Sequence, residues 1–316
     1  MKRKLPIIIV LCLTAFTSCI KDDIANCPGK MHFHFSYIYG GVNRFFEMEK
    51  TDLGIHFYHA GEATRYRQMT IPRNSIGLTE PLTMDKTPDD LDQLEVISWS
   101  TDPAIEYVNA PDTPQGEGYV HLKEITEGSG ICRPVDDLFY GRVTFDAEDR
   151  FARTDVTIPY VRAVCRMRVT MIPESVQSRG TILEDGTTHE GTTRAAIVIP
   201  HPEDYTFHVS GTLNTINDNN IVGGEEIILA PECYYDETDG YVKTNWFGAF
   251  PGKEEEYLKV NVFIKEKEVA QFDCAPNGIA SVAGNYVDLV IDGRYVRPVL
   301  EVRVDGWRVA IITSNM

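Results

Sequence analysis

The sequence lacks the short motifs that mark most catalytic and nucleotide-binding sites. No GxSxG, HExxH, P-loop or GxGxxG occurs in its 316 residues, and the GEG at 116–118 has neither the third glycine nor the helix that a dinucleotide site needs. The seven cysteines contain no CxxC pair, so zinc and thioredoxin-type sites have no support. We therefore predict no cofactor, no metal and no enzymatic activity.

Positive charge is scarce. The chain has 30 Lys and Arg against 47 Asp and Glu, a formal net charge of −17. Nucleic acids bind proteins of the opposite charge, so a nucleic-acid partner is disfavoured. Apolar residues make up 43% of the chain, which is ample for folded cores and argues against disorder.

Long apolar runs are missing, apart from LPIIIVLCLTAF at 5–16. A membrane-spanning helix needs roughly 20 apolar residues, and this run is shorter. It follows three basic residues and precedes two small ones, which is the pattern of a cleaved export signal. We predict that residues 1–18 are removed, which leaves 27 basic against 47 acidic residues and a net charge of −20.

The residue at the predicted cleavage point is a cysteine. The segment FTSC (16–19) resembles the lipobox of bacterial lipoproteins, in which Cys19 becomes the acylated N-terminus. Stable anchoring takes more than one acyl chain, and a triacylated cysteine carrying chains such as palmitate meets that condition. A plain secretory signal with an incidental cysteine is the alternative.

A charged triplet follows the cysteine. Lys21, Asp22 and Asp23 resemble the export tag of lipoproteins that gut and oral anaerobes display on their surface. This resemblance implies an outer-membrane protein that faces outward, with residues 19–29 as its lipidated tether. The alternative is a polar tether without an export role.

Five further cysteines remain after the signal and the lipidated position are set aside. One or two disulfides are allowed in an exported protein, and free buried thiols are an equal alternative. These cysteines are Cys27, Cys132, Cys165, Cys233 and Cys274.

Period-two alternation recurs along the chain and predicts antiparallel sheets. In MHFHFSYIY (31–39) it places Phe33, Phe35 and Tyr37 on one face and His32, His34 and Ser36 on the other. Only TPDDLDQL (87–94) favours a short helix, and 173–193 is a predicted polar loop. We predict two tandem β-sandwiches, at 30–158 and 159–316, because the run 155–171 is too long for one strand and contains a proline.

Several residue groups admit a chemical role, but each has a simpler interpretation. His32, His34, His56 and His59 on two strands permit a metal site, although strand histidines more often face solvent. The acidic segment DETDG (236–240) is better explained as a turn than as a calcium loop. Trp99 and Trp307 each end an alternating strand, which favours a core position over a carbohydrate platform.

Several segments together resemble one protein family. They are SCIKDDIANCP (18–28), LEVISWST (94–101), DDLFYGRVTF (136–145), IPYVRAVCRMRV (158–169) and LEVRVDGW (300–307). Their order and spacing are similar to those of the FimB and Mfa-type minor fimbrial lipoproteins, the fimbrillin-associated anchor subunits of anaerobic bacteria. The resemblance implies two transthyretin-like sandwiches, a non-catalytic role in fimbria assembly and fimbrillin or accessory subunits as partners.

The mechanism that this resemblance implies is β-augmentation, in which a strand of one subunit completes an open sheet of the next. The long, alternating C-terminal run 299–312 is our candidate for the exchanged strand, and an ordinary internal strand is the alternative. Its candidate contact residues are Val299, Val302, Val304 and Trp307.

Two functions of other classes stay open. A surface glycan-binding lipoprotein of a nutrient-capture system would show exposed coplanar Trp and Tyr side chains. A secreted hydrolase would need two facing carboxylates at about 5 to 9.5 Å.

Overall fold

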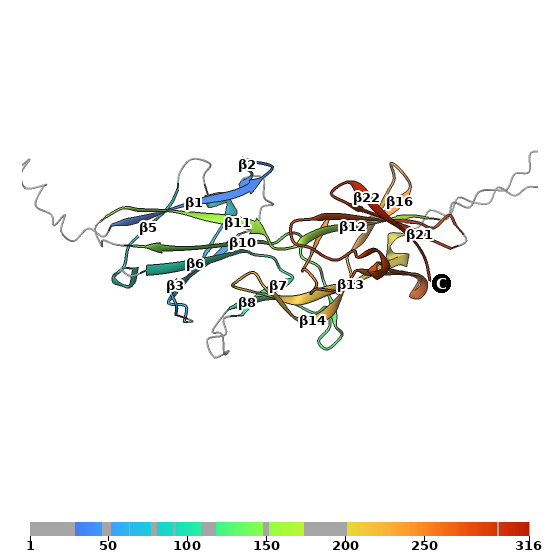
Figure 1. Ribbon diagram of the computed structural model, residues 1–316, viewed down its shortest axis with the longest axis horizontal. Coiled ribbons are helices and arrows are strands. Elements are labelled where there is room, and N and C mark those ends of the chain that lie inside the picture. Colours follow the sequence, from blue (N-terminus) through green and yellow to red (C-terminus); the bar gives the residue numbers. More distant parts are fainter. Residues whose placement is uncertain are drawn as a thin grey trace, which may run out of the picture. The chain divides into compact units, whose positions relative to one another are not determined.

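The protein is built from β-strands. The computed structural model describes residues 29–45, 52–62, 64–76, 81–90, 93–108, 118–147, 152–173, 201–295 and 297–315. Over these residues, strands are joined by turns and by single-turn 3₁₀ helices, and no α-helix occurs (Figure 1). The predicted all-β class is confirmed. No helix in the described ranges has the length and apolar character to cross a membrane.

The chain packs into two compact units, and neither is a continuous stretch. Unit 1 holds Met1–Ser98 and Gly141–Tyr160, and unit 2 holds Trp99–Tyr140 and Val161–Met316. The chain therefore passes between the units three times. Residues 99–140 belong to unit 2, while our division of the chain at residues 158 and 159 stays a prediction.

The strands of unit 1 belong to one eight-stranded sheet. Along the sheet the order is β2 (Val42–Asn43), β1 (Lys30–Tyr39), β11 (Thr154–Arg162), β10 (Phe139–Asp146), β6 (Gln93–Ser100), β3 (Leu53–His59) and β4 (Arg67–Ile71), with β5 (Leu82–Asp85) paired to β1. Its short helices are η3 (Arg73–Ser75) and η4 (Pro88–Asp90).

Strand β1 has the alternation that its sequence predicts. Phe33, Phe35 and Tyr37 are buried, whereas His34 is exposed. The buried rings meet partners from other strands and loops, since Phe33 packs edge-on against Phe57 at 5.9 Å. One face of β1 therefore forms part of the core of unit 1.

A histidine is buried in the neighbouring strand β3. His56 is 7% exposed, and the Arg65 guanidinium lies 2.8 Å from its Nδ1. A guanidinium has no lone pair to offer, so Nδ1 accepts the hydrogen bond and the ring is neutral. Burial first, and the charge of Arg65 second, lower the pKa of His56 to about 3.

Unit 2 is formed by two sheets. The first has the order β15 (Cys233–Asp236), β16 (Tyr241–Thr244), β12 (Cys165–Ile172), β20 (Tyr286–Asp292), β21 (Val299–Val304) and β22 (Trp307–Thr313), with β17 (Phe247–Ala249) paired to β12. The second has the order β19 (Lys267–Asp273), β18 (Lys259–Ile264), β13 (Tyr205–Asn217), β14 (Val222–Leu229) and β9 (Ile131–Cys132), with β8 (Tyr119–Leu122) paired to β13 and to β7 (Ile105–Val108). Its short helices are η5 (Pro202–Asp204) and η6 (Ala275–Asn277).

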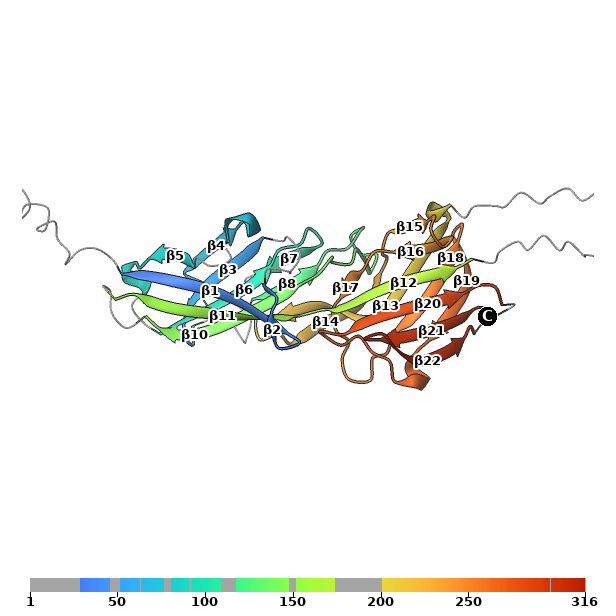
Figure 2. The ribbon, with the colours of Figure 1, turned by 90° about the horizontal axis from the view of Figure 1, so that it is seen from above.

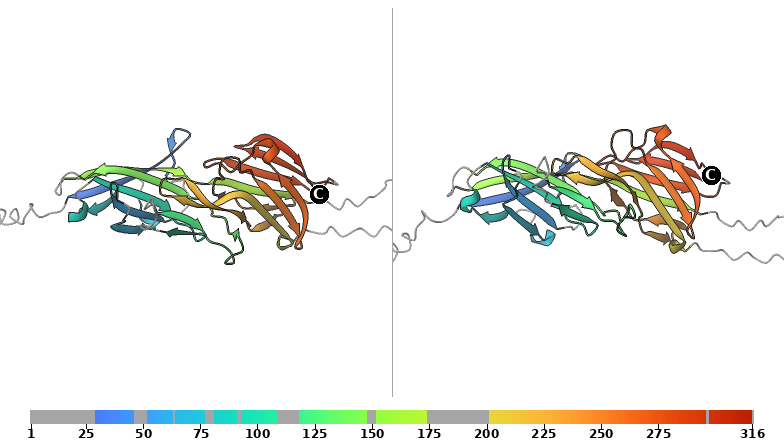
Figure 3. Two further views of the ribbon diagram at one scale, coloured as in Figure 1. Left: turned by 60° about the horizontal axis from the view of Figure 1, so that its bottom comes forward. Right: turned by 90° about the horizontal axis from the view of Figure 1, so that it is seen from below.

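The two sheets of unit 2 lie in separate layers, with β12 drawn in green among the orange and red strands (Figures 2 and 3). Alternate residues of β12, including Met167 and Val169, are fully buried. Phe207 and Val209 of β13 are buried in the same way. The core of unit 2 is therefore the space between these layers, as in a sandwich.

Strand β13 contains a bulge that needs glycine. Its pairing with β14 shifts between Val209 and Thr212, and Gly211 there has a φ of +86°. A Cβ on Gly211 would lie 2.2 Å from the Tyr257 carbonyl oxygen. Glycine thus supplies both the left-handed backbone and the close approach of another chain segment.

One secondary-structure prediction is corrected here. The helix expected at 87–94 is only the single turn η4, because the apolar alternation that follows it already belongs to strand β6 from Gln93 onward. The predicted loop at 173–193 lies, except for Pro173, outside the described residues.

Candidate functional site

The C-terminal hairpin is the structural form of the predicted exchange strand. β21 pairs with β20 on one side and with β22 on the other. The turn between β21 and β22 has positive φ at Asp305 and Gly306. Val302 is buried, whereas Val299 and Val304 are half-buried. The candidate run thus contains two strands. β21 lies between β20 and β22, and β22 is the last strand of the sheet.

Strand β22 carries an exposed apolar surface, which we call the β22 patch and define as Trp307, Val309 and Ile311. Their side chains are 79%, 50% and 58% exposed. The core position predicted for Trp307 is therefore wrong. Trp307 is exposed because it begins the last strand of the sheet, directly after the Asp305–Gly306 turn. A last strand has a neighbouring strand on one side only, so fewer residues surround it.

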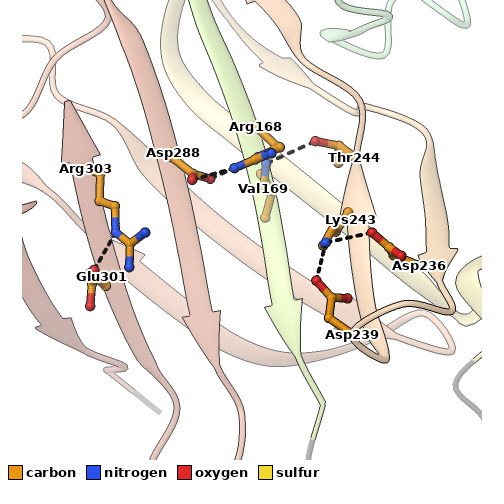
Figure 4. A network of polar contacts seen from close by, with 9 residues as sticks. All are labelled: Arg168, Val169, Asp236, Asp239, Lys243, Thr244, Asp288, Glu301 and Arg303. Atoms are coloured by element: carbon orange, nitrogen blue, oxygen red, sulfur yellow. Dashed lines mark hydrogen bonds and ion pairs between the residues drawn. The ribbon is translucent and has the colours of Figure 1, made fainter. Parts of the chain in front are cut away.

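The outward face of the same sheet holds a row of ion pairs (Figure 4). Arg168 donates two hydrogen bonds to Asp288, at 2.7 and 3.2 Å, and Arg303 donates to Glu301 at 2.6 Å. The hydrogen bonds to Asp288 raise the pKa of Arg168. On this face an ion pair therefore joins β12 to β20 in addition to the backbone bonds, whereas the Arg303–Glu301 pair lies within β21.

The acidic turn at 236–240 belongs to this face. Lys243 pairs with Asp236 at 2.8 Å and also with Asp239 (Figure 4). The hydrogen bond from Lys243 first, and hydrogen bonds from Thr238 second, lower the pKa of Asp236 to about 2. An internal lysine thus occupies these carboxylates, which fits the interpretation as a turn.

Two of the quoted sequence segments meet in a buried ion-pair cluster. Asp137 of DDLFYGRVTF accepts hydrogen bonds from Arg162 at 3.1 and 3.2 Å and lies 3.3 Å from Arg166, both of IPYVRAVCRMRV. The three side chains are between 4% and 10% exposed. Burial raises the pKa of Asp137, and the two guanidinium groups oppose that shift. The two motifs therefore hold each other in unit 2.

A second buried cluster centres on Asp218, in the turn between β13 and β14. Its carboxylate accepts hydrogen bonds from Trp99 Nε1 at 3.0 Å and from the Tyr107 hydroxyl at 2.7 Å. The Tyr140 hydroxyl donates to its backbone carbonyl at 2.5 Å. The predicted core position of Trp99 is confirmed, since it is 2% exposed, and its role is structural.

The remaining candidates are the N-terminal residues and the strand histidines. Cys19, Lys21, Asp22 and Asp23 lie outside the described residues. Within the described ranges, no three His, Cys, Asp or Glu side chains are grouped to hold a metal ion. His34 instead faces Asp155 at 3.5 Å.

The described cysteines are free thiols. Burial raises the pKa of Cys132 and Cys165 to about 11, and that of Cys233 and Cys274 to about 12. A thiol is nucleophilic only as the thiolate, so these four act as small packed side chains. Cys27 lies outside the described residues.

Residues 24–313 match the family model of the fimbrillin-A associated anchor proteins Mfa1 and Mfa2. The chain belongs to this family. The protein is thus a fimbria-associated subunit, as the resemblance in its motifs implied, and membership supports a non-catalytic role. No curated protein matches the sequence.

Solved structures share the fold at low identity. The fimbrial anchor protein Mfa2 from Porphyromonas gingivalis is 12% identical with a TM-score of 0.54, and the match covers 90% of this chain and 99% of that one. A candidate adhesin from Bacteroides ovatus is 13% identical with a TM-score of 0.57, covering 89% and 94%. A candidate polysaccharide-binding protein from Bacteroides thetaiotaomicron is 13% identical with a TM-score of 0.56, covering 89% and 97%.

Sequence reasoning missed two residues that the fold makes important. Asp218 follows a strand in a polar turn, and Trp246 lies in a short segment without alternation. Trp246 packs against Tyr286 with an interplanar angle of 80°, so this pair does not have the coplanar arrangement that a flat glycan platform would need. The only available signal was that tryptophan is rare here, with three in the chain.

Proposed function

We propose that this protein is the outer-membrane, lipid-anchored minor subunit that tethers or terminates a fimbrillin polymer. The family match to fimbrial anchor proteins carries the proposal. The proposal is supported by the sequence of residues 1–23, which has the pattern of an export signal, a lipobox-like FTSC and the charged triplet Lys21, Asp22 and Asp23. Acyl chains on Cys19 would hold the protein by hydrophobic burial, at about 0.8 kcal/mol for each buried CH₂.

The partner contact in this proposal is β-strand exchange at the C-terminal hairpin. β22 is the last strand in the order of its sheet, and an unpaired strand edge is a template for another chain. The β22 patch adds three exposed apolar side chains beside that edge. Main-chain hydrogen bonds would supply affinity, and Trp307 and Ile311 would supply specificity by filling alternate pockets of the fimbrillin partner.

Replacing Cys19 tests the anchor. In the native host we expect the wild type to be cleaved by externally added protease and to remain with the outer membrane. We expect Cys19→Ala to be released into the medium, with or without attached fimbriae. A Cys19→Ala protein that stays membrane-bound would contradict the lipid anchor.

Changing the β22 patch tests strand exchange without deleting a strand. We expect Trp307→Ser with Ile311→Ser to reduce the recovery of fimbrillin in a pull-down at least tenfold. The matched control is Ile221→Ser with Val282→Ser, which changes two other exposed apolar residues of unit 2. Equal recovery by both double variants, with unchanged melting temperatures, would show that β22 is an ordinary strand.

A further inference from the structure

Four loops of unit 2 meet around a pocket of about 280 Å³. They connect β6 to β7, β9 to β10, β14 to β15 and β16 to β17. Three prolines, an alanine and a phenylalanine form the apolar part of the lining. Its polar and aromatic groups are Asp102, Asp136, Glu232, Arg133, Asn245 and Trp246. This mixture of apolar walls and a few polar groups is typical of small-molecule sites.

The loops are fixed to one another by hydrogen bonds. The Asp102 carboxylate accepts from its own loop, at the Ala104 N–H (2.7 Å), and from the next loop, at the Asp136 N–H (2.9 Å). The Gly248 N–H donates to the Val135 carbonyl at 2.6 Å, which ties the β9–β10 loop to β17. The pocket is therefore shaped before any ligand arrives.

The Trp246 ring is also held in place. The Arg168 guanidinium lies over it, 4.8 Å from the ring centroid, and Arg168 is itself held by two hydrogen bonds to Asp288. Tyr286 packs against Trp246 in a T-shaped arrangement at 5.6 Å. Trp246 is half-buried and still lines the pocket. The ring is a rigid apolar surface within a polar cavity.

We propose that this pocket binds one neutral pyranose unit of a glycan. A sugar ring has an apolar C–H face, which suits a tryptophan, and hydroxyls that both donate and accept hydrogen bonds. The lining offers acceptors in three carboxylates and donors in Arg133 and the Asn245 amide. The volume of about 280 Å³ lies at the small end of ligand pockets, which span about 300 to 1,000 Å³, and this suits a ligand as small as one monosaccharide.

Other ligand classes fit the lining less well. Three carboxylates against one arginine repel an anion, and the chain as a whole has a net charge of −17. A lipid or aromatic ligand would remove water from these charged groups and offer them no hydrogen bonds in exchange, which is costly. Glu232 and Arg133 lie 3.5 Å apart and already pair with each other at the surface, which leaves less charge to attract a free cation.

The pocket is independent of the β22 patch, so each can be tested while the other is intact. Migration of the purified chain would be measured by affinity electrophoresis in gels that contain yeast mannan, galactomannan or amylopectin as neutral glycans. Chitosan and heparin would serve as the cationic and anionic probes. We expect at least one neutral glycan to retard the wild type, and heparin to have no effect.

Two pocket variants and one control assign the binding to this site. We expect Trp246→Ala to weaken retardation at least tenfold. Because Trp246 also packs on Arg168 and Tyr286, the second variant, Glu232→Gln with Asn245→Ala, changes only exposed side chains and should weaken binding several-fold. The control Trp307→Ala removes an exposed tryptophan from the same unit and should change binding less than twofold.

Three results would overturn the proposal. In the first, none of the neutral glycans retards the wild type. In the second, the Glu232→Gln, Asn245→Ala variant binds as the wild type does, which would place the glycan elsewhere. In the third, chitosan alone binds and salt abolishes the effect, which would make the pocket a cation site.

Discussion

The charge on Asp137 is the feature of unit 2 whose removal should be most damaging. We consider Asp137→Asn, which keeps the size of the side chain and removes its negative charge. Arg162 and Arg166 would then remain, 10% and 8% exposed, without their shared carboxylate. Removing one partner of a buried ion pair costs about 3 to 5 kcal/mol, or roughly two to four orders of magnitude in the folding equilibrium.

Tryptophan fluorescence makes this measurement specific to unit 2. The chain has three tryptophans, Trp99, Trp246 and Trp307, and all three belong to unit 2. Urea denaturation followed by tryptophan emission therefore reports the unfolding of that unit. The m-value should stay unchanged, since a change in stability alone moves only the midpoint.

A matched control uses an exposed pair in the same unit. Asp292 accepts two side-chain hydrogen bonds from Arg294, at 2.7 and 2.9 Å, but Arg294 is 54% exposed. Exposed ion pairs contribute little, so Asp292→Asn should shift the midpoint far less than Asp137→Asn. Equal shifts would refute the reasoning. So would a loss below about 1 kcal/mol for Asp137→Asn, because a carboxyl that is already protonated loses little when it becomes an amide.

Three further outcomes test other parts of the fold. The folded-state pKa of His56, about 3, is below its unfolded value of 6.5, so unit 1 should lose up to about 5 kcal/mol progressively as the pH falls through this interval; hydrogen exchange on unit 1 peptides measures this, and His56→Gln should flatten the pH dependence. Gly211→Ala should cost well over 2 kcal/mol because its Cβ would clash with a carbonyl oxygen, whereas Gly284→Ala, with a similar φ and open space, should cost only about 1 to 2; thermal melts compare the two, and similar losses would contradict the steric argument. Asp218→Ala removes the acceptor of the buried Trp99 N–H and of the half-buried Tyr107 hydroxyl, and should cost about 2 to 4 kcal/mol in the fluorescence assay; a loss below about 1 kcal/mol would show that other groups satisfy these donors.

Periodicity predicted the strands because it depends on local geometry alone. The alternation of Phe33, Phe35 and Tyr37 with His34 is a property of any strand that has one buried face, and the structure has the same burial. The prediction of a helix at 87–94 was wrong. It rested on a proline and two aspartates rather than on periodicity. The apolar residues after them already follow the period of strand β6.

The partners of each strand are set by contacts between residues far apart in the chain, which a single sequence does not display. Residues 99–140 belong to the same unit as 161–316, although residues 141–160 of the other unit lie between them. The sequence alone gives no sign that three charged residues are buried together. They are Asp137, Arg162 and Arg166, and the tertiary structure brings them into one buried cluster.

Period-two alternation and the ordered motifs were thus enough to predict an all-β, fimbria-associated protein, because alternation depends on local geometry and the motifs depend on family resemblance. The three tryptophans show what they could not decide. The sequence placed Trp99 and Trp307 at the ends of similar alternating runs, yet Trp99 is buried against Asp218 and Trp307 lies 79% exposed at the start of β22. Trp246 gave no local signal and lines a pocket formed by four separate loops. Alternation specifies which face of a strand is apolar, but only the tertiary structure determines whether another layer covers that face.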